Sequence, residues 1–230
     1  MATHIKNMFG AFGRGRHLAL LISLLLLFLI TPFVEAIRYG IVILTIAGAI
    51  VLLSGIYAMS ERRRLFVITL IGAAATVAIN WLMVVLQSEW IAIASDGLTL
   101  LLLGLFSIGI LDDVLRRGRI SADKIRGAIC VYLLIGFAWA VGYAIVELIN
   151  PGSFSGLAEI DPHNYVGRVM QMRYFSFTTL TTLGFGDILP RSPVARTLAT
   201  LEAMTGQIYL AVLIARLVGL HIVHVSSRDD

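Results

Sequence analysis

Long apolar runs separated by short polar segments account for most of the chain. A helix needs about 20 residues to cross the hydrocarbon core of a bilayer, which is about 30 Å thick. Lipid cannot satisfy backbone amide and carbonyl groups, so a helix is the only open-chain structure that crosses it. The pattern predicts six membrane-spanning helices, over residues 18–34, 39–59, 65–86, 90–111, 127–149 and about 196–225.

The polar connections between these runs divide the chain into two parts. Three of the first four connections hold about five residues or fewer, which predicts tight antiparallel hairpins among the first four helices. The connection over residues 112–126 is longer and strongly charged. We therefore expect a four-helix transmembrane domain over residues 1–124, followed by a second domain over residues 125–230.

Composition supports a membrane protein. Hydrophobic residues make up 58% of the chain and charged residues 14%, whereas soluble domains hold about 45–50% and about 25%. The formal net charge is +4, but the basic residues lie in short clusters between apolar runs, which argues against a nucleic-acid partner. The single cysteine, Cys130, excludes an internal disulfide framework, and no Cys/His set has the spacing of a metal site.

The basic clusters also predict how the chain is oriented in the membrane. With the amino terminus inside the cell, most of the 18 Lys and Arg residues fall in cytoplasmic segments. We therefore expect both termini to be cytoplasmic and the protein to lie in the cell inner (plasma) membrane. The first run has an alternative interpretation as a signal peptide with a weak cleavage site near residues 34–36.

The connection over residues 150–192 contains a second apolar stretch that is too short to cross a membrane. This stretch ends in Gly184 and Gly186, which predicts a half-helix that enters the membrane, turns and leaves as extended backbone. The two glycines permit positive φ at alternate positions. Such alternation can direct four successive carbonyl groups toward one axis, those of Thr182, Leu183, Gly184 and Phe185. Four chains around that axis would form oxygen cages able to replace the water shell of an ion.

The segment reads Thr182-Leu183-Gly184-Phe185-Gly186-Asp187. It resembles the selectivity filter of the tetrameric potassium channels, whose usual form is Thr-Val-Gly-Tyr-Gly-Asp. The likeness extends over about residues 125–225, because an outer helix, a descending pore helix, the filter and an inner helix follow in the same order. The resemblance implies an all-α membrane protein with six transmembrane helices and a re-entrant pore helix and filter between the fifth and sixth. Residues 125–230 would then be the pore domain.

The same resemblance implies the function and the partners. The chain would be one subunit of a homotetramer that lies in membrane lipid and conducts potassium passively across the membrane, with no catalysed reaction and no cofactor beyond the permeant ion. Potassium would bind at the backbone of Thr182, Leu183, Gly184 and Phe185, with Gly186 completing the filter. Phe185 replaces the usual tyrosine and lacks its hydroxyl, which suggests a filter that collapses more readily.

Three residues are candidates for supporting the filter, namely Thr181, Asp187 and Tyr174. Many relatives place a tryptophan eight residues before the first filter threonine, where it hydrogen-bonds the filter aspartate. Tyr174 stands at that position, so its hydroxyl could serve Asp187; an ordinary interfacial aromatic is the other interpretation. Some relatives carry a buried acid four residues before the filter, where this chain has Thr178.

The candidate gating residues in the sequence each have a second interpretation. Gly206 lies where relatives often bend the inner helix, although close packing of small residues would also explain a glycine there. His221 and His224 could form a pH sensor on one helix face, or simply be solvated. The fourth run, residues 90–111, has no arginine ladder, so we expect no strong voltage gating. About 11 residues follow Gly219, so we expect no soluble ligand-binding domain on this chain.

Two alternatives remain open from sequence. A cation channel of weaker selectivity would share the same topology, but the unbroken Gly184-Phe185-Gly186 argues against it. A subunit of a potassium-uptake transporter would be expected to show internal repeats with paired broken helices. This chain has one re-entrant segment and no second half that resembles the first.

Overall fold

The computed structural model describes residues 15–34, 40–59, 63–86, 89–115, 121–157 and 165–226. These residues form seven helices and one two-stranded sheet. The elements are α2 (Arg16–Val34), α3 (Gly40–Ala58), α4 (Arg63–Leu86), α5 (Glu89–Leu115), α6 (Ala122–Ile149), β1 (Phe154–Ser155), α7 (Tyr165–Leu180), β2 (Leu189–Pro190) and α8 (Pro193–Ser226).

The prediction of an all-α, multi-pass membrane protein is confirmed. Each of the six apolar runs is a helix, with ends that differ from the sequence prediction by a few residues. Four helices of the described chain are long and apolar enough to cross a membrane, namely α2, α5, α6 and α8. The apolar parts of α3 and α4 are shorter, over Ile43–Ala58 and Phe66–Ile79.

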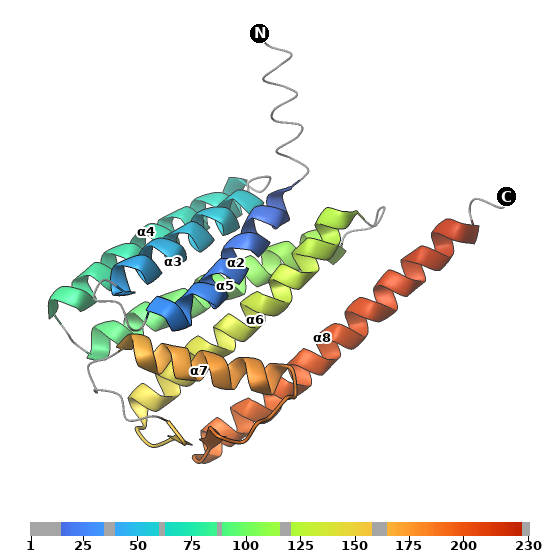
Figure 1. Cartoon of the computed structure of the whole chain (residues 1–230). Helices are drawn as coiled ribbons and strands as arrows, with labels where there is room; N and C mark the ends of the chain where they lie inside the picture. Colours follow the sequence, from blue (N-terminus) through green and yellow to red (C-terminus); the bar gives the residue numbers. More distant parts are fainter. Residues whose placement is uncertain are drawn as a thin grey trace, which may run out of the picture.

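α6 is the central helix of the molecule (Figure 1). It packs against α5 and α2 on one side and against α7 and α8 on the other. α3 and α4 lie beyond α2 and α5, on the side of the molecule away from α8. The side chains of the main core come from α2, α5 and α6, and those of Leu20, Phe106 and Leu134 are fully buried.

Polar contacts join the helix ends where α2 begins. His17 is buried, and its Nδ1 atom lies 2.8 Å from a carboxylate oxygen of Asp123 at the start of α6. The thiol of Cys130 is also buried and donates to the backbone carbonyl of His17. The Arg216 guanidinium of α8 donates to the carbonyl of Leu115 at the end of α5. These contacts therefore join α2 to α6 and α5 to α8 at this end.

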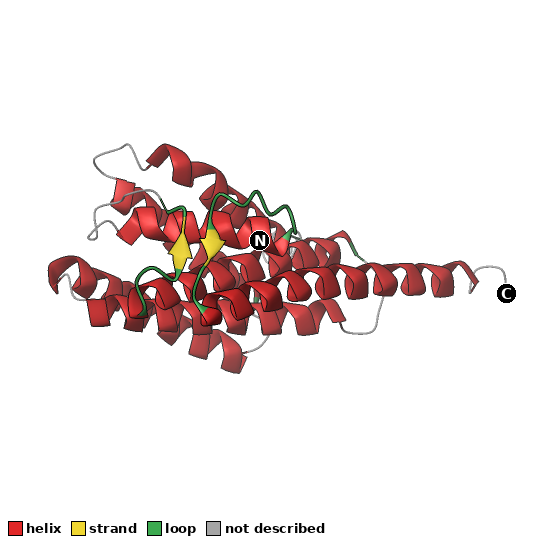
Figure 2. Ribbon diagram, turned by 90° about the horizontal axis from the view of Figure 1, so that it is seen from below, coloured by secondary structure: helices red, strands yellow, loops and turns green. Residues whose placement is uncertain are grey.

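The opposite end holds α7 and the loop that follows it. α2 begins and α8 ends at one end of the bundle, whereas α7 and the connection to α8 lie at the other (Figure 1). Figure 2 shows β1 and β2 side by side there, with Phe154 opposite Pro190 in an antiparallel register. The rings of Phe154, Tyr143 and Phe175 meet edge to face, with centroids 5.1–5.4 Å apart. This cluster fixes α7 against α6.

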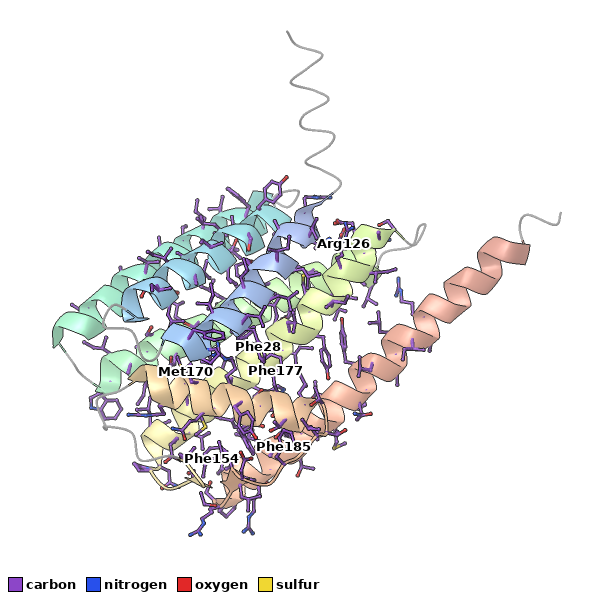
Figure 3. The ribbon with its side chains drawn as sticks, viewed as in Figure 1. Phe28, Arg126, Phe154, Met170, Phe177 and Phe185 are labelled. Carbon is purple, nitrogen blue, oxygen red and sulfur yellow. The ribbon has the colours of Figure 1, made fainter. Side chains whose placement is uncertain are left out.

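A second aromatic cluster joins α7 to the first helix. The Phe177 ring of α7 packs edge to face on Phe28 of α2 and on Phe137 of α6, with centroids 5.0 and 5.4 Å apart. Phe28 and Phe177 face each other where α2 and α7 meet (Figure 3). The Arg173 guanidinium lies 5.7 Å from the centroid of Phe28 and 5.8 Å from that of Phe137, within cation–π range. The position of α7 therefore depends on α2 as well as on α6.

Candidate functional site

The site begins where α7 ends. The N–H of Thr182 donates to the carbonyl of Thr179 at 2.9 Å, and the N–H of Leu183 donates to that of Thr178 at 2.8 Å. These two bonds, together with a left-handed residue at Thr182 (φ 58°), make a Schellman cap. Such caps usually use glycine, because a side chain at positive φ is strained and a β-branched one especially so. The helix therefore stops sharply at Thr182, the first residue of the predicted filter segment, residues 182–187.

Positive φ recurs at every second residue after this cap. Gly184 has φ 55° and Gly186 has φ 80°, which extends the left-handed conformation of Thr182 along the segment. Nothing in the described chain lies within 4 Å of where a Cβ of either glycine would be. The glycines are therefore required by backbone conformation rather than by crowding.

The carbonyl groups of this segment are left without intrachain partners. In the part of the chain that the structure describes, no hydrogen bond ends on the carbonyl oxygens of Thr182, Leu183, Gly184 or Phe185. The side chains of Leu183 and Phe185 are 58% and 66% exposed, although both are apolar. A segment whose carbonyl groups accept no hydrogen bond can bind a dehydrated cation when copies of the segment surround one axis.

The structure brings Tyr174 and Asp187 together. The Tyr174 hydroxyl is hydrogen-bonded to the Asp187 carboxylate, and this bond holds the pKa of Asp187 below its ordinary value. The Tyr174 ring also lies parallel to the ring of Phe185, with centroids 6.4 Å apart. Thr181 caps α7 differently, because its hydroxyl donates to the carbonyl of Phe177 at 2.6 Å.

The loop after α6 lies against the far end of the segment. Gly156 has φ 82°, and a Cβ on it would lie 1.7 Å from the carbonyl oxygen of Asp187. Both carboxylate oxygens of Glu147 accept backbone N–H groups of this loop, from Gly152 and Phe154. Phe154 and Phe185 lie at the same end of the molecule (Figure 3). The loop is thus held by α6 and limits the space beside Asp187.

α8 lies behind the segment and approaches the end of α7 closely. A Cβ on Gly206 would lie 2.3 Å from the carbonyl oxygen of Leu180. The next residue, Gln207, has its amide nitrogen 3.5 Å from the Thr182 hydroxyl oxygen. From the other side, the Tyr132 hydroxyl of α6 donates to the same Leu180 carbonyl at 3.3 Å. The end of α7 is therefore held between α6 and α8.

Several predicted residues need separate comment. Gly206 lies in the interior of α8, and its close contact with α7 explains the glycine without a bend; the hinge stays a prediction. His221 and His224 fall in the last turns of α8, where the side chains lie outside the described residues.

The sequence did not single out Ser176 or Tyr143, which contact the buried Glu202. An acid inside an apolar helix was the available signal, but it does not reveal its partners.

Among the described residues, no group of three or more His, Cys, Asp or Glu side chains could hold a metal ion.

Comparison with known proteins finds one family that is similar to part of the chain. Residues 161–220 match the family described as Ion channel, and these residues include α7, residues 182–187 and most of α8. This part of the chain is therefore similar to ion channels. Similarity to an ion-channel family agrees with the prediction that the chain is not an enzyme.

One characterised relative is similar over part of its length. An inward rectifier potassium channel, Kirbac3.1 of Paramagnetospirillum magnetotacticum, is 33% identical over 86 residues. The aligned segment covers 36% of this chain and 24% of that channel, so it spans about a quarter of the relative. No solved structure matches the chain.

Proposed function

We propose that the chain is one subunit of a potassium-selective channel, in which four copies surround a single conduction pathway. The alternating positive φ values at Thr182, Gly184 and Gly186 are the observation that carries this proposal. They accompany four successive carbonyls that accept no hydrogen bond from the described residues, at the end of a short helix. A row of such oxygens, repeated around an axis, replaces the hydration shell of an ion.

The assembly follows from the cost of exposing irregular backbone to lipid. Non-helical backbone at membrane depth is tolerated only where protein or water surrounds it. Residues 181–187 are all exposed in the single chain, so neighbouring copies and a water-filled axis would have to cover them. α8 supports the same conclusion, because only 11% of Pro193–Arg216 is buried, against 44% of Ala122–Ile149 in α6. An inner helix so little covered by its own chain has a face available to other subunits.

The topology completes the proposal. α2, α3, α4, α5, α6 and α8 each cross the membrane, and α7 enters and leaves on one side. An even number of crossings agrees with the start of α2 and the end of α8 lying at one end of the bundle (Figure 1). The basic clusters favour the cytoplasm for that end and an inner (plasma) membrane location. Residues 1–124 form the peripheral four-helix domain, without an arginine ladder, and residues 125–230 form the pore domain.

Potassium is the proposed ion for two reasons. The filter segment keeps both glycines of the potassium-channel form, and its two departures, Leu183 and Phe185, change side chains rather than the backbone ligands. The similar protein Kirbac3.1 is a potassium channel by name.

Flux from liposomes tests the proposal. The purified protein would be reconstituted, and potassium and sodium flux would be measured in matched vesicles, with barium as a blocker. We expect potassium flux that barium stops and little sodium flux. Equal flux of both ions would favour the weakly selective channel.

Two glycine variants provide the matched control. Gly184→Ala and Gly152→Ala each place a side chain at positive φ, and neither new Cβ meets another atom within 4 Å. The backbone strain is therefore similar, but only Gly184 belongs to the filter. We expect Gly184→Ala to abolish flux and Gly152→Ala to retain it. Equal flux from both variants would contradict the proposed filter.

A further inference from the structure

Glu202 is a fully buried acid in the middle of the contact between three helices. One of its carboxyl oxygens lies 2.5 Å from the Tyr143 hydroxyl oxygen of α6. The other lies 2.5 Å from the Ser176 hydroxyl oxygen of α7. Ser176 in turn lies 2.7 Å from the backbone carbonyl oxygen of Gly136. The four groups form one continuous chain from α6 through α8 and α7 back to α6.

The number of protons that these four hydrogen-bonded groups share can be counted. Ser176 carries one hydroxyl proton but lies within hydrogen-bond distance of two oxygens. The carbonyl of Gly136 can only accept, so the Ser176 proton must lie on that side for this contact to be favourable. The short contact between Ser176 and Glu202 then needs a proton from the carboxyl group. Tyr143 supplies the proton of the remaining contact.

The surroundings agree with a neutral carboxyl group. Arg173 of α7 faces the rings of Phe28 and Phe137. On α8 itself, Arg196 donates to Pro190 and Arg216 donates to Leu115. The hydrogen-bond partners that α6 and α7 offer to Glu202 are the hydroxyls of Tyr143 and Ser176. An ionised carboxylate buried in an apolar site without a cation would be very costly.

We propose that Glu202 carries a proton and acts as a positioning residue for the filter, by joining α8 to α7 through Ser176. This inference rests on the proposed channel function. Ser176 lies one turn before the end of α7, and Thr178 of the same turn accepts the N–H groups of Leu183 and Gly184. The protonated bridge therefore fixes the last turn of α7, whose Thr178 carbonyl accepts hydrogen bonds from the filter backbone.

Glutamine is the decisive replacement. Its amide carbonyl can accept from Tyr143 and its amide N–H can donate to Ser176, so Glu202→Gln preserves every contact of a protonated glutamate. Glu147 is the matched control, since both of its oxygens accept backbone N–H groups. In Glu147→Gln the amide nitrogen would face an N–H group, and one contact would be lost.

The experiment combines flux with infrared spectroscopy on the full-length protein in liposomes. We expect Glu202→Gln to keep the wild-type potassium flux. Glu202→Ala should lower the flux about tenfold or more, because the buried hydrogen-bond partners of Glu202 are left unsatisfied. Glu147→Gln should also lower the flux. The wild-type-minus-Glu202→Gln infrared difference spectrum should contain the carbonyl stretch of a protonated carboxylic acid, which an ionised Glu202 would not produce.

The outcomes separate the two proposals. If the wild-type protein shows no potassium flux but the infrared band is present, the channel function fails while the protonated bridge stands. Loss of flux in Glu202→Gln, or a difference spectrum that contains only a carboxylate band, would overturn the inference even if the wild-type protein conducts. The infrared arm remains decisive if Glu202→Ala does not fold.

Discussion

Replacing Gly206 by alanine tests how α8 contacts the end of α7. The new Cβ would lie 2.3 Å from the carbonyl oxygen of Leu180, whereas real Cβ atoms essentially never approach closer than 3.0 Å. α8 and α7 must therefore separate by at least 0.7 Å. The obstacle is a backbone atom, which cannot rotate away as a side chain can.

The free-energy change has two opposing parts. Overpacking costs about 1–3 kcal/mol, and the upper part of that range applies to a rigid obstacle. Removing a glycine from a helix interior returns about 0.5–1 kcal/mol. We therefore expect Gly206→Ala to destabilise the protein by about 1–2 kcal/mol. For a chain of this length, each kcal/mol lowers the Tm by about 2–4 °C.

The assay is thermal unfolding in detergent, followed by potassium flux from liposomes. Gly142→Ala in α6 is the control, because nothing lies within 4 Å of its Cβ position. We expect Gly142→Ala to leave the Tm unchanged or raise it slightly, and Gly206→Ala to lower both Tm and flux. The prediction separates packing from a hinge, since a hinge alone would alter opening without lowering the Tm. Equal Tm values for the two variants would refute the packing argument.

Three further predictions follow from individual contacts. Tyr174→Phe removes the hydrogen bond that lowers the pKa of Asp187, so a carboxyl-carbon NMR titration should show that pKa rising toward its ordinary value. In the wild-type protein, this contact stabilises the fold at pH values above the ordinary pKa of Asp187, and the stabilisation is lost as the pH falls through the lowered pKa. An unchanged pKa in the variant would show that the hydrogen bond has no effect. Gly156→Ala would place a Cβ 1.7 Å from the Asp187 carbonyl oxygen at φ 82°, so it should reduce potassium flux strongly, and wild-type flux would argue against this contact. Phe28→Ala removes the edge-to-face contact with Phe177 and should lower stability by about 0.5–1.5 kcal/mol beyond the loss of buried area, which a wild-type Tm would disprove.

The helices could be predicted from sequence because the membrane imposes one length and one structure. Six apolar runs of roughly the required length are helical in the structure, and this does not depend on which helices pack against them. The positive φ of Gly184 and Gly186 was also accessible, because glycine is the residue that adopts it without strain. These features depend on local chemistry.

Other features depend on tertiary structure and could not be predicted. Thr182 adopts a left-handed conformation that its β-branched side chain disfavours, because the cap at the end of α7 requires it. Glu202 meets Ser176 and Tyr143 across 26 and 59 residues of chain, so no local pattern joins them. The resemblance to potassium channels suggested a hinge at Gly206, but only the structure reveals the carbonyl group beside it.

The reversal potential under bi-ionic conditions tests the central claim most directly. The reconstituted wild-type protein would be recorded in a planar bilayer, with potassium on one side and an equal concentration of sodium on the other. If the carbonyls of residues 182–185 form a potassium-selective filter, the current should reverse far from zero, at a voltage of the sign set by the potassium gradient. A current that reverses at zero would contradict the account, because the pathway would then not distinguish the two ions.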